Sequence, residues 1–491
     1  MKILLVCPNG GFYGMYQDWP MGLLAIASYL KQFGHEIRIY DRNVETVSLR
    51  RVVREFKPQI SGVSVFTTNC VKDGLKVSAA LKNMGIPVVW GGYVATIAPE
   101  LVIAEHAADY VVINEGEVTF HELLQALERG WSLAEINGLA YRDASGQVHR
   151  TEPREFANLA KFQPTDWSLI RPQRYLSPFF CCNKLGHLYC SKGCPARCTF
   201  CMNESYHKCQ YRKRPNEHVV QEIAYLAREH GMDGVRFADE LFGANKAELY
   251  DLCDRIRALN LKVFSWGCQT RLGHFNREDL QHMHNAGCRW IFFGVESGCP
   301  DMQKRINKRI DLTKVVEQFE MCKEIGISVF CNFIIGFPDE TKEQIKKSVQ
   351  LAQRLESSWC SFVIFFPSCD SALERELIQR GQLQPLQSLR QLSSKRMVYQ
   401  GVSNNYSQVP TRDLLVVQSH FMWKSFFAKG DSAGMSRYSI ATKSIKTMLR
   451  MMFSKGLLSL FGQVFTAART FFGFAWYRFA YPKIRREYGL R

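Results

Sequence analysis

The chain has 491 residues, of which 46% are apolar and 22% are charged, and its formal net charge is +17. This length accommodates about three domains, and the composition excludes a disordered chain. The positive charge is compatible with nucleic acid, an anionic membrane surface or an anionic substrate. Seventeen cysteines are spread over a long chain without an N-terminal signal peptide, which favours the reducing cytoplasm over a disulfide-linked secreted fold.

The first 117 residues alternate short apolar runs with helix-length segments. The apolar runs cover residues 3–7, 36–40, 60–66, 87–90 and 110–113, with helical patterns at 22–33 and 71–84 between them. Continuous apolar strands that alternate with helices predict a parallel sheet covered on both faces. We therefore expect a doubly wound α/β domain over residues 1–137, with ligands bound beyond the carboxyl ends of its strands.

Different patterns follow. Residues 139–142 and 147–151 flank an Asp-Ala-Ser-Gly turn, which predicts a hairpin within a proline-containing linker at 138–185. Strand and helix signals then alternate again over residues 186–372. The expected strands cover residues 234–237, 262–267, 290–294, 328–335 and 359–366. This pattern predicts a partial barrel of about six strand–helix units, and residues 373–491 are expected to be mainly helical.

The sharpest chemical signal is the segment CPARCTFC at residues 194–201. Thiolates of Cys194, Cys198 and Cys201 can converge from one loop, bind three irons of a cubane cluster and leave the fourth iron open. A zinc site would need a further well-spaced pair of Cys or His residues, and none is suitably placed. The alternative to a cluster is three unconnected thiols.

This spacing, with the aromatic Phe200, resembles the radical S-adenosylmethionine (SAM) superfamily. In that family the amino and carboxylate groups of SAM chelate the open iron, and one electron from the cluster cleaves SAM to a 5′-deoxyadenosyl radical. The resemblance implies a [4Fe-4S] cluster on the three cysteines and SAM as cosubstrate. Four later strand ends resemble the same family in order, namely FADELF at 237–242, GCQTR at 267–271, GVESG at 294–298 and IIGFPDET at 334–341.

The resemblance also implies roles for residues at these strand ends. Asp239 and Glu240 are expected to hold the amino group of SAM, and Arg271 stands at the next strand end. Glu296 and Ser297 are expected near the ribose and carboxylate, and Gly336 near the adenine. Phe200 is also expected to bind the cofactor. The segment PSCDS at 367–371 departs from the family pattern Pro-x-Pro-Gly-Thr, so the loop on the substrate side is unusual.

A doubly wound domain ahead of a radical SAM module resembles the cobalamin-binding subfamily, and this resemblance covers residues 1–370. It is carried by SVFT at 64–67, GGY at 91–93 and NEGE at 114–117. The resemblance implies that cobalamin binds at these strand ends, with polar hydrogen bonds to its nucleotide tail and paired glycines that let the tail pass the backbone. The expected cobalamin-binding residues are Ser64, Thr67, Gly91, Gly92, Tyr93 and Glu117.

The loop at residues 8–22 departs from the cobalamin pattern Asp-x-His-x-x-Gly because it contains no histidine. It offers Asn9, Tyr13, Tyr16, Gln17 and Asp18, none of which is a cobalt ligand comparable to imidazole. We therefore predict that cobalamin binds with its own base displaced and with no histidine below the cobalt. The alternatives are that this domain is a structural lid or a nucleotide-binding module, although no phosphate-binding glycine motif is present.

Three features have competing interpretations. Cys181, Cys182, Cys190 and Cys209 flank the triplet and either hold an auxiliary cluster or, as we favour, are packing residues. The basic run at 212–214 meets a phosphate or carboxylate or, as we favour, is a solvated surface. Residues 431–491 contain eleven Lys or Arg and two acidic residues, and 456–477 are aromatic-rich with a single charge. This tail is either an interfacial amphipathic helix on an anionic membrane or a helix packed on the barrel.

The main hypothesis is a cobalamin-dependent radical SAM enzyme that methylates an unactivated carbon of a small-molecule, lipid or peptide substrate. Its alternative is a ring-forming or oxidative cyclase with the same cofactors. An electron donor such as flavodoxin or ferredoxin is expected. The protein itself is expected in the cytoplasm or peripherally at the inner membrane surface. A nucleic-acid binder would need basic and aromatic residues on a recognised module, so no nucleic-acid partner is expected. Methylthiolation of transfer RNA is disfavoured because that family's extra cluster cysteines and RNA-binding module are not recognisable.

Overall fold

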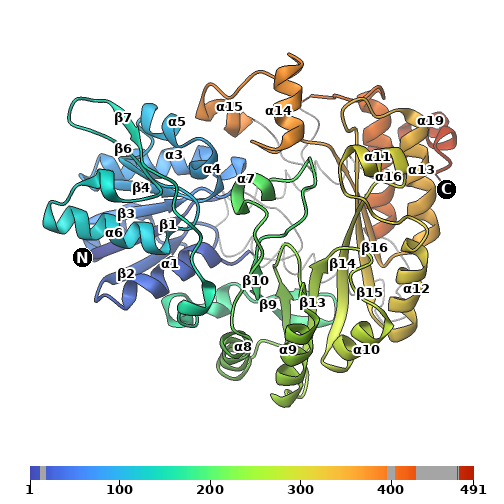
Figure 1. Cartoon of the computed structure of the whole chain (residues 1–491), viewed down its shortest axis with the longest axis horizontal. Coiled ribbons are helices and arrows are strands. Elements are labelled where there is room, and N and C mark those ends of the chain that lie inside the picture. The colour runs from blue at the N-terminus through green and yellow to red at the C-terminus, as the bar shows by residue number, and fades with distance from the viewer. Residues whose placement is uncertain (11–17, 395–403, 427–472, 474, 491) are drawn as a thin grey trace.

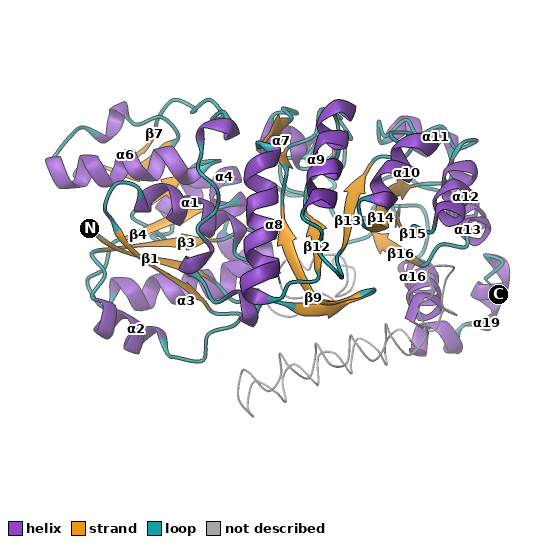
Figure 2. Cartoon of the chain, turned by 90° about the horizontal axis from the view of Figure 1, so that it is seen from below, coloured by secondary structure: helices purple, strands orange, loops and turns teal. Residues whose placement is uncertain are grey.

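The fold was analysed in a computed structural model, which describes residues 1–10, 18–394, 404–426, 473 and 475–490 (Figure 1). It contains two seven-stranded sheets, one in the N-terminal domain and one in a partial barrel. The N-terminus lies at the outer end of the first domain, so β1 and the strands parallel to it run toward the second sheet (Figures 1 and 2). The carboxyl ends of the first sheet therefore face the barrel.

The first sheet is doubly wound. Its strand order is β2-β1-β3-β4-β5-β6-β7, and β1 to β5 are parallel. The parallel strands are β1 (Lys2–Cys7), β2 (Glu36–Asp41), β3 (Ile60–Ser64), β4 (Val88–Gly91) and β5 (Tyr110–Val112). In the order 2-1-3-4-5 the connections reverse direction between β1 and β3, and ligands bind at such a switch point. The expected doubly wound domain is confirmed, and its switch point lies at the loops after Cys7 and Ser64.

Helices cover both faces of this sheet because its strands are apolar on both sides. The helices α1 (Met21–Lys31) and α6 (Gly116–Arg129) pack on one face, with Leu24 and Leu123 fully buried against Leu5. The opposite face is covered by α2 (Leu49–Phe56), α3 (Thr68–Lys82), α4 (Tyr93–Ile97) and α5 (Pro99–Ala104).

The hairpin predicted from the sequence forms, but it does not lie in a free linker. Its strands β6 (Leu139–Arg142) and β7 (Val148–Arg150) extend the first sheet, with β6 antiparallel to β5. Leu139 and Ala140 are fully buried, so the apolar side chains of β6 complete the edge of the domain core. Sequence periodicity identifies a hairpin but not the sheet to which it is added.

The second sheet has the order β16-β15-β14-β13-β12-β9-β8. Six strands are parallel, in agreement with a partial barrel of about six strand–helix units: β9 (Cys182–Leu188), β12 (Gly234–Phe237), β13 (Ser265–Thr270), β14 (Cys288–Glu296), β15 (Ser328–Ile335) and β16 (Trp359–Ile364). The strand β9 has no counterpart among the five predicted ranges, and it begins inside the segment 138–185 that was predicted to be a linker. The strand β8 (Ser177–Phe179) is added antiparallel to β9. The strand predicted over residues 262–267 starts at residue 265, because the segment before it carries the exposed Val263 instead of a buried apolar run.

The main barrel helices lie along the outside of the curved second sheet (Figure 1). They are α8 (Asn216–His230), α9 (Lys246–Ala258), α10 (Arg277–Asn285), α12 (Val315–Ile325) and α13 (Lys342–Leu355). Inside the curve, one end of the barrel is closed by an aromatic cluster that includes Phe180, Trp290 and Phe330. The opposite end, where the strands finish, therefore remains as the place for a reaction site.

Shorter elements connect the two sheets. Near the cysteine motif these are β10 (Ser191–Lys192), β11 (Arg212–Lys213) and α7 (Asn203–His207). The turn η1 (Leu133–Glu135) precedes β6 in the first domain, and η2 (Leu159–Lys161), η3 (Trp167–Leu169) and η4 (Pro172–Arg174) lie between the two sheets. The remaining helices are α11 (Pro300–Arg305), α14 (Ala372–Gln379), α15 (Leu389–Ser394), α16 (Thr411–Phe426) and α19 (Pro482–Glu487). Leu389 and Leu392 of α15 pack into the core of the first domain, so the chain returns to that domain after the barrel.

The C-terminal region is mainly helical, as expected, where the structure describes it. The helix α16 packs on β16, and α19 packs on α16. No helix within the described ranges is both long and apolar enough to cross a bilayer. Of the aromatic-rich stretch 456–477, nearly all lies outside the described residues.

Candidate cluster and cofactor site

The three motif cysteines lie in the loop between β10 and α7. The backbone N–H of Cys201 donates to the carbonyl of Cys198 at 3.0 Å, and the Asn203 side chain accepts from the N–H of Cys194 at 3.0 Å. None of the three forms a disulfide, and burial raises the pKa of Cys201 to about 11, helped by the nearby Cys198. Within the described residues, no three His, Cys, Asp or Glu side chains are grouped closely enough to hold a single metal ion.

The acidic end of β12 holds this loop in place. The Asp239 carboxylate, 2% exposed, accepts from the N–H of Cys190 at 3.1 Å and from the Ser191 hydroxyl. The Glu240 carboxylate accepts from the N–H of Gly193 at 2.9 Å and lies 3.3 Å from Nε2 of His207. These contacts anchor the segment that leads into Cys194.

The two acidic side chains differ in what remains accessible. Burial raises the pKa of Asp239 to about 6, against the hydrogen bonds from Ser191 and Cys190 that lower it. Burial also opposes ionisation of Glu240, but the hydrogen bond and charge of His207 lower its pKa overall. The Glu240 side chain is 43% exposed. Of the two predicted SAM ligands, Glu240 is thus the one whose carboxylate is accessible to a ligand.

Two cations lie close to the cysteines. Burial raises the pKa of Cys194, and the charges of Lys308 and Arg271 act in the opposite direction. Nζ of Lys308 is 3.0 Å from Oε1 of Glu296, which lies at the end of β14 with a φ of +64°. Arg271 and Glu296 were predicted from their strand ends, whereas Lys308 was not. The site therefore presents a carboxylate and two cations beside the cluster loop, which suits the zwitterionic end of SAM.

Phe200 and Gly336 also meet at this site. The Phe200 ring lies 5.8 Å from that of Phe337, the residue after Gly336. Gly336 has a φ of +81°, and its N–H donates to the buried carboxylate of Glu340 at 2.6 Å. A side chain at Gly336 would meet Leu414 of α16 at 2.9 Å, so this glycine is needed for helix packing as well as for the turn.

Ser297 behaves differently from its neighbours. It is fully buried, its hydroxyl lies 3.2 Å from that of Ser348, and it accepts from the N–H of Cys299 at 3.2 Å. These contacts tie the end of β14 to α13. A direct contact between Ser297 and SAM therefore stays a prediction that this geometry does not favour.

The strand ends of the first domain carry the residues predicted to bind the cobalamin tail. Ser64 is half-buried at the end of β3, and Oγ1 of Thr67 lies 3.2 Å from Sγ of Cys70. A Cβ added to Gly91 would meet open space, whereas one on Gly92, with a φ of +93°, would meet the backbone of Val65 at 3.0 Å. Gly91 thus leaves room beside the sheet for a tail, and Gly92 permits close packing of two strand ends.

The loop after β1 is only partly described. Tyr13, Tyr16 and Gln17 lie outside the described residues. The N–H of Asn9 donates to Asp73 at 2.7 Å, and Oδ1 of Asp18 lies 3.9 Å from Nδ1 of His187 in the barrel strand β9. That cobalamin binds with no histidine below its cobalt stays a prediction.

The remaining two predicted cobalamin residues contact the barrel. The Tyr93 hydroxyl donates to the carbonyl of Cys369 at 2.5 Å, in the unusual loop after β16. Glu117 lies 3.4 Å from Nζ of Lys192, which is also 3.0 Å from Glu115. Both residues therefore join the two domains, and their contact with cobalamin stays a prediction.

Arg212 completes a buried ion-pair network at this boundary. Its guanidinium donates to both carboxylate oxygens of Glu115, at 2.6 and 2.9 Å. We call Lys192, Arg212, Glu115 and Glu117 the interface network. Arg214 pairs with Glu222 inside the barrel and is also buried. The favoured interpretation of the basic run as a solvated surface is therefore wrong, because Arg212 and Arg214 meet buried carboxylates.

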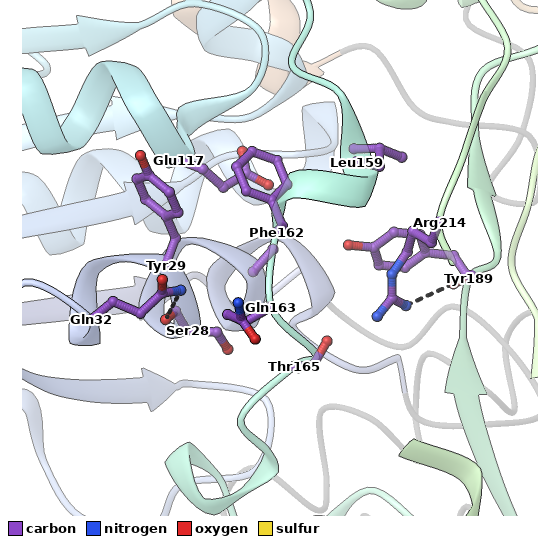
Figure 3. A pocket seen from close by; sticks show the side chains of 11 residues that line it. Ser28, Tyr29, Gln32, Glu117, Leu159, Phe162, Gln163, Thr165, Tyr189 and Arg214 are labelled. Carbon is purple, nitrogen blue, oxygen red and sulfur yellow. Dashed lines mark hydrogen bonds between the residues drawn. The ribbon is translucent and has the colours of Figure 1, made fainter. Parts of the chain in front are cut away.

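Figure 3 shows a small pocket near this network. It is lined by Ser28 and Tyr29 of α1, by Gln32 just after that helix, by Glu117, by residues of the 159–165 segment, and by Tyr189 and Arg214 of the barrel. Cys194, Cys198 and Cys201 do not line this pocket, and the guanidinium of Arg214 donates to the Tyr189 carbonyl at 2.8 Å. The pocket is a packing gap between domains rather than the reaction site.

The four flanking cysteines lie in different surroundings. Cys182 belongs to the aromatic cluster that closes the barrel, whereas Cys190 is buried in the main core. Cys181 is exposed, and Sγ of Cys209 contacts the carbonyl of Ala196 at 3.6 Å. Their different surroundings favour packing over an auxiliary cluster.

Comparisons with known proteins agree with this geometry. Residues 188–352 match the model of the radical SAM superfamily, and residues 16–124 match that of the B12 binding domain. An uncharacterised methyltransferase of Pyrococcus horikoshii, PH0819, is 31% identical over 385 residues, 75% of this chain and 81% of the relative. An anaerobic magnesium-protoporphyrin IX monomethyl ester cyclase of Rubrivivax gelatinosus is 26% identical over 394 residues, 77% of this chain and 70% of the relative.

Among solved structures, the radical SAM methyltransferase TsrM of Kitasatospora setae, with cobalamin and a [4Fe-4S] cluster bound, shares the fold. The TM-score is 0.71 at 18% identity, over 91% of this chain and 99% of that one. The chain belongs to the cobalamin-binding radical SAM enzymes. Its cofactors are a [4Fe-4S] cluster, SAM and cobalamin.

Proposed function

We propose that the chain is a methyltransferase that adds a methyl group to an unactivated carbon of a small-molecule, lipid or peptide substrate. The observation that carries this proposal is the interface network, which joins the NEGE segment after β5 to the residue two positions before Cys194. The two cofactor-binding regions thus face each other at the ends of their sheets. Of the two relatives, the one with the higher identity is named a methyltransferase and the other a cyclase.

The cofactors would supply a methyl donor and a radical that removes a substrate hydrogen. In this proposal Cys194, Cys198 and Cys201 hold the cluster, while Glu240, Arg271 and Glu296 orient SAM beside it. Lys308 is an additional residue of this set, because it pairs with Glu296 and its charge reaches the cysteines. Ser64, Thr67 and Gly91 line the path of the cobalamin tail, and the two domains together exclude water from the reacting groups.

The decisive experiment uses SAM with a deuterated methyl group. The full chain is reconstituted anaerobically with iron, sulfide and hydroxocobalamin and incubated with a reductant and fractionated small-molecule, lipid and peptide pools. Mass spectrometry is expected to find a product that gains the labelled methyl group, together with 5′-deoxyadenosine. A product with no added carbon would instead identify a cyclase, and a product without label would contradict methyl transfer.

The electron donor, the location and any membrane contact belong to the same proposal. A flavodoxin or ferredoxin in the cytoplasm is the expected donor, by resemblance to the family. The described end of the tail packs on the barrel: Tyr488 and Leu490 are buried, and Gln353 of α13 donates to the carbonyl of Gly489 at 2.8 Å. A lipid contact would therefore involve the surface around this end rather than all of residues 431–491.

A further inference from the structure

A group of cations gathers where α16 meets the C-terminal segment. His420 and Lys424 lie one turn apart on α16, Arg478 lies in the helical turn before α19, and Arg485 lies in α19. The Arg478 guanidinium donates to Nδ1 of His420 at 2.5 Å. The charges of Arg478, Arg485 and Lys424 all act on His420. We call these four residues the C-terminal cation cluster.

Hydrogen-bond donors without acceptors characterise this cluster. His420 is 0% exposed, and because its Nδ1 accepts from Arg478, its Nε2 carries the hydrogen. Nε2 of His420 and Nε of both Arg478 and Arg485 are buried and have no hydrogen-bond partner in the described part of the chain. Buried polar groups are normally satisfied, so several unmatched donors in one place call for an acceptor.

The carboxylates near the C-terminal cation cluster pair with residues outside it. Asp413, two turns before His420 on α16, lies 3.7 Å from Nζ of Lys342 and 3.4 Å from the Tyr488 hydroxyl. Glu487 of α19 also pairs with Lys342. Within residues 404–426 and 475–490, neither Arg478 nor Arg485 forms an ion pair. The cations therefore face one another without a counter-charge.

The cations of the cluster repel one another because they are partly buried and therefore weakly screened by water. Burial lowers the pKa of Arg478, and the charge of Arg485 lowers it further. Burial, followed by the three neighbouring cations, lowers the pKa of His420 to about 3. A bound anion would accept from the unmatched donors and remove the repulsion in one step.

We propose that the C-terminal cation cluster binds a phosphate group. Two guanidinium groups, an imidazole N–H and an ammonium offer donors from several directions, as a tetrahedral anion with several oxygens requires. Trp476 and Phe479, which are 65% and 58% exposed, stand on the same helical turn as Arg478. This surface combines a phosphate site with aromatic side chains, so the phosphate belongs either to a lipid headgroup or to a soluble compound.

Calorimetric titration of the reconstituted full chain with inorganic phosphate tests the site, at constant ionic strength maintained with chloride. Arg478→Gln and Arg485→Gln are each expected to weaken phosphate binding about ten-fold or more, because each removes a charge-assisted hydrogen bond. Arg486→Gln is the matched control, since Arg486 is an exposed neighbour on α19 outside the cluster. Its affinity is expected to stay within about two-fold of the original chain.

Two further measurements keep the test decisive. Arg478→Lys retains the charge and is expected to recover part of the affinity, and phosphate is expected to raise the Tm of the original chain but not of Arg478→Gln. A chain that does not bind phosphate, or an Arg486→Gln variant that loses as much affinity as Arg478→Gln, would overturn the proposal.

Vesicles distinguish the two sources of phosphate. Co-sedimentation compares phosphatidylglycerol with phosphatidylcholine vesicles, in the presence and absence of inorganic phosphate. Binding to phosphatidylglycerol that phosphate and Arg485→Gln both abolish would identify a lipid headgroup. Phosphate binding without vesicle binding would identify a soluble phosphate compound. Vesicle binding that Arg478→Gln and Arg485→Gln leave unchanged, without phosphate binding, would refute the site.

Discussion

Two groups of cations in the described part of the chain differ in the counter-charges that surround them. In the interface network Lys192 and Arg212 face Glu115 and Glu117, so positive and negative charges are equal in number. In the C-terminal cation cluster Arg478 and Arg485 have no carboxylate partner among the residues described there. A balanced network can hold two domains together by itself, whereas an unbalanced one is complete only with a ligand.

The electrostatic consequences run in opposite directions. Burial opposes ionisation of Glu115, but Lys192 and Arg212 lower its pKa overall, so the carboxylate stays charged. At His420 burial and the neighbouring cations act together, and the imidazole stays neutral. In the sequence, the cations of both regions are simply Lys, Arg and His residues. Only the contacts in the fold distinguish the positioning role of the interface network from the proposed binding role of the C-terminal cation cluster.

The largest expected effect is on the loop that the interface network holds. Replacing Cys194, Cys198 and Cys201 together by Ala is expected to abolish both the visible iron–sulfur absorbance and the formation of 5′-deoxyadenosine, because no thiolate ligand remains in the loop. Absorbance and product analysis after anaerobic reconstitution measure this. Cys209→Ala is the control, and retention of both signals in the triple variant would contradict the cluster assignment.

Breaking the balance of the interface network is expected to have the next largest effect. Lys192→Met leaves two buried carboxylates with one cation, which costs about 3–5 kcal/mol of unfolding free energy. Denaturant unfolding measures the loss, with Lys192→Arg as the control that keeps the charge. If Lys192→Met were as stable as Lys192→Arg, the network would not join the domains.

If the interface network positions the cluster loop, a Lys192 variant is also expected to change the spectrum of the cluster. The cluster resonance of Lys192→Arg is expected to respond to added SAM as in the original chain, whereas Lys192→Met is expected to lose this response even when its cluster content is equal. Electron paramagnetic resonance of the reduced protein, with and without SAM, makes the comparison. Equal responses would leave the network a purely structural contact.

A smaller effect is expected at the acidic end of β12. Glu240→Gln removes the accessible carboxylate and is expected to weaken SAM binding by about 1.5–3 kcal/mol, or about ten- to a hundred-fold. Asp239→Asn is expected to act mainly on the loop, since its oxygens already accept from residues 190 and 191. Calorimetry measures both, and unchanged SAM binding in Glu240→Gln would remove this residue from the site.

Much of the fold could be predicted from the sequence because the strands are short apolar runs with turns at both ends. The strand at 328–335 matches β15 at both ends. The cysteine spacing alone predicts the cluster loop. The hairpin at 139–150 was recognised, but its sheet partner was not, because pairing between distant strands leaves no local periodicity.

The parts of the site that could not be predicted depend on long-range contacts. Lys192 and Glu115 are 77 positions apart and meet only when the two sheets pack end to end. Lys308 lies after a short helix with no motif of its own, yet its amine reaches Glu296. Ser297 carries a family-like signature, but its hydroxyl is bonded within the barrel. Strand-end motifs therefore locate a site more reliably than they assign the role of each side chain.

The smallest expected effect sharpens the comparison at the C-terminal cation cluster. An unfolded histidine has a pKa of about 6.5, whereas burial and the nearby cations lower that of folded His420 to about 3. Between these values the unfolded chain binds a proton that the folded chain does not. The free energy of unfolding therefore falls as the pH falls, by up to about 1.4 kcal/mol per pH unit from this residue.

His420→Gln is expected to remove this contribution, so its unfolding free energy falls less steeply than that of the original chain between about pH 6 and pH 5. The groups that face His420 are Lys424 on its own helix and Arg478 and Arg485 on the C-terminal segment. Saturating phosphate is expected to flatten the slope of the original chain, because a bound anion stabilises the protonated imidazole. Equal slopes in the two chains without phosphate would show that His420 is not held neutral by unbalanced cations, and the contrast with the interface network would then fail.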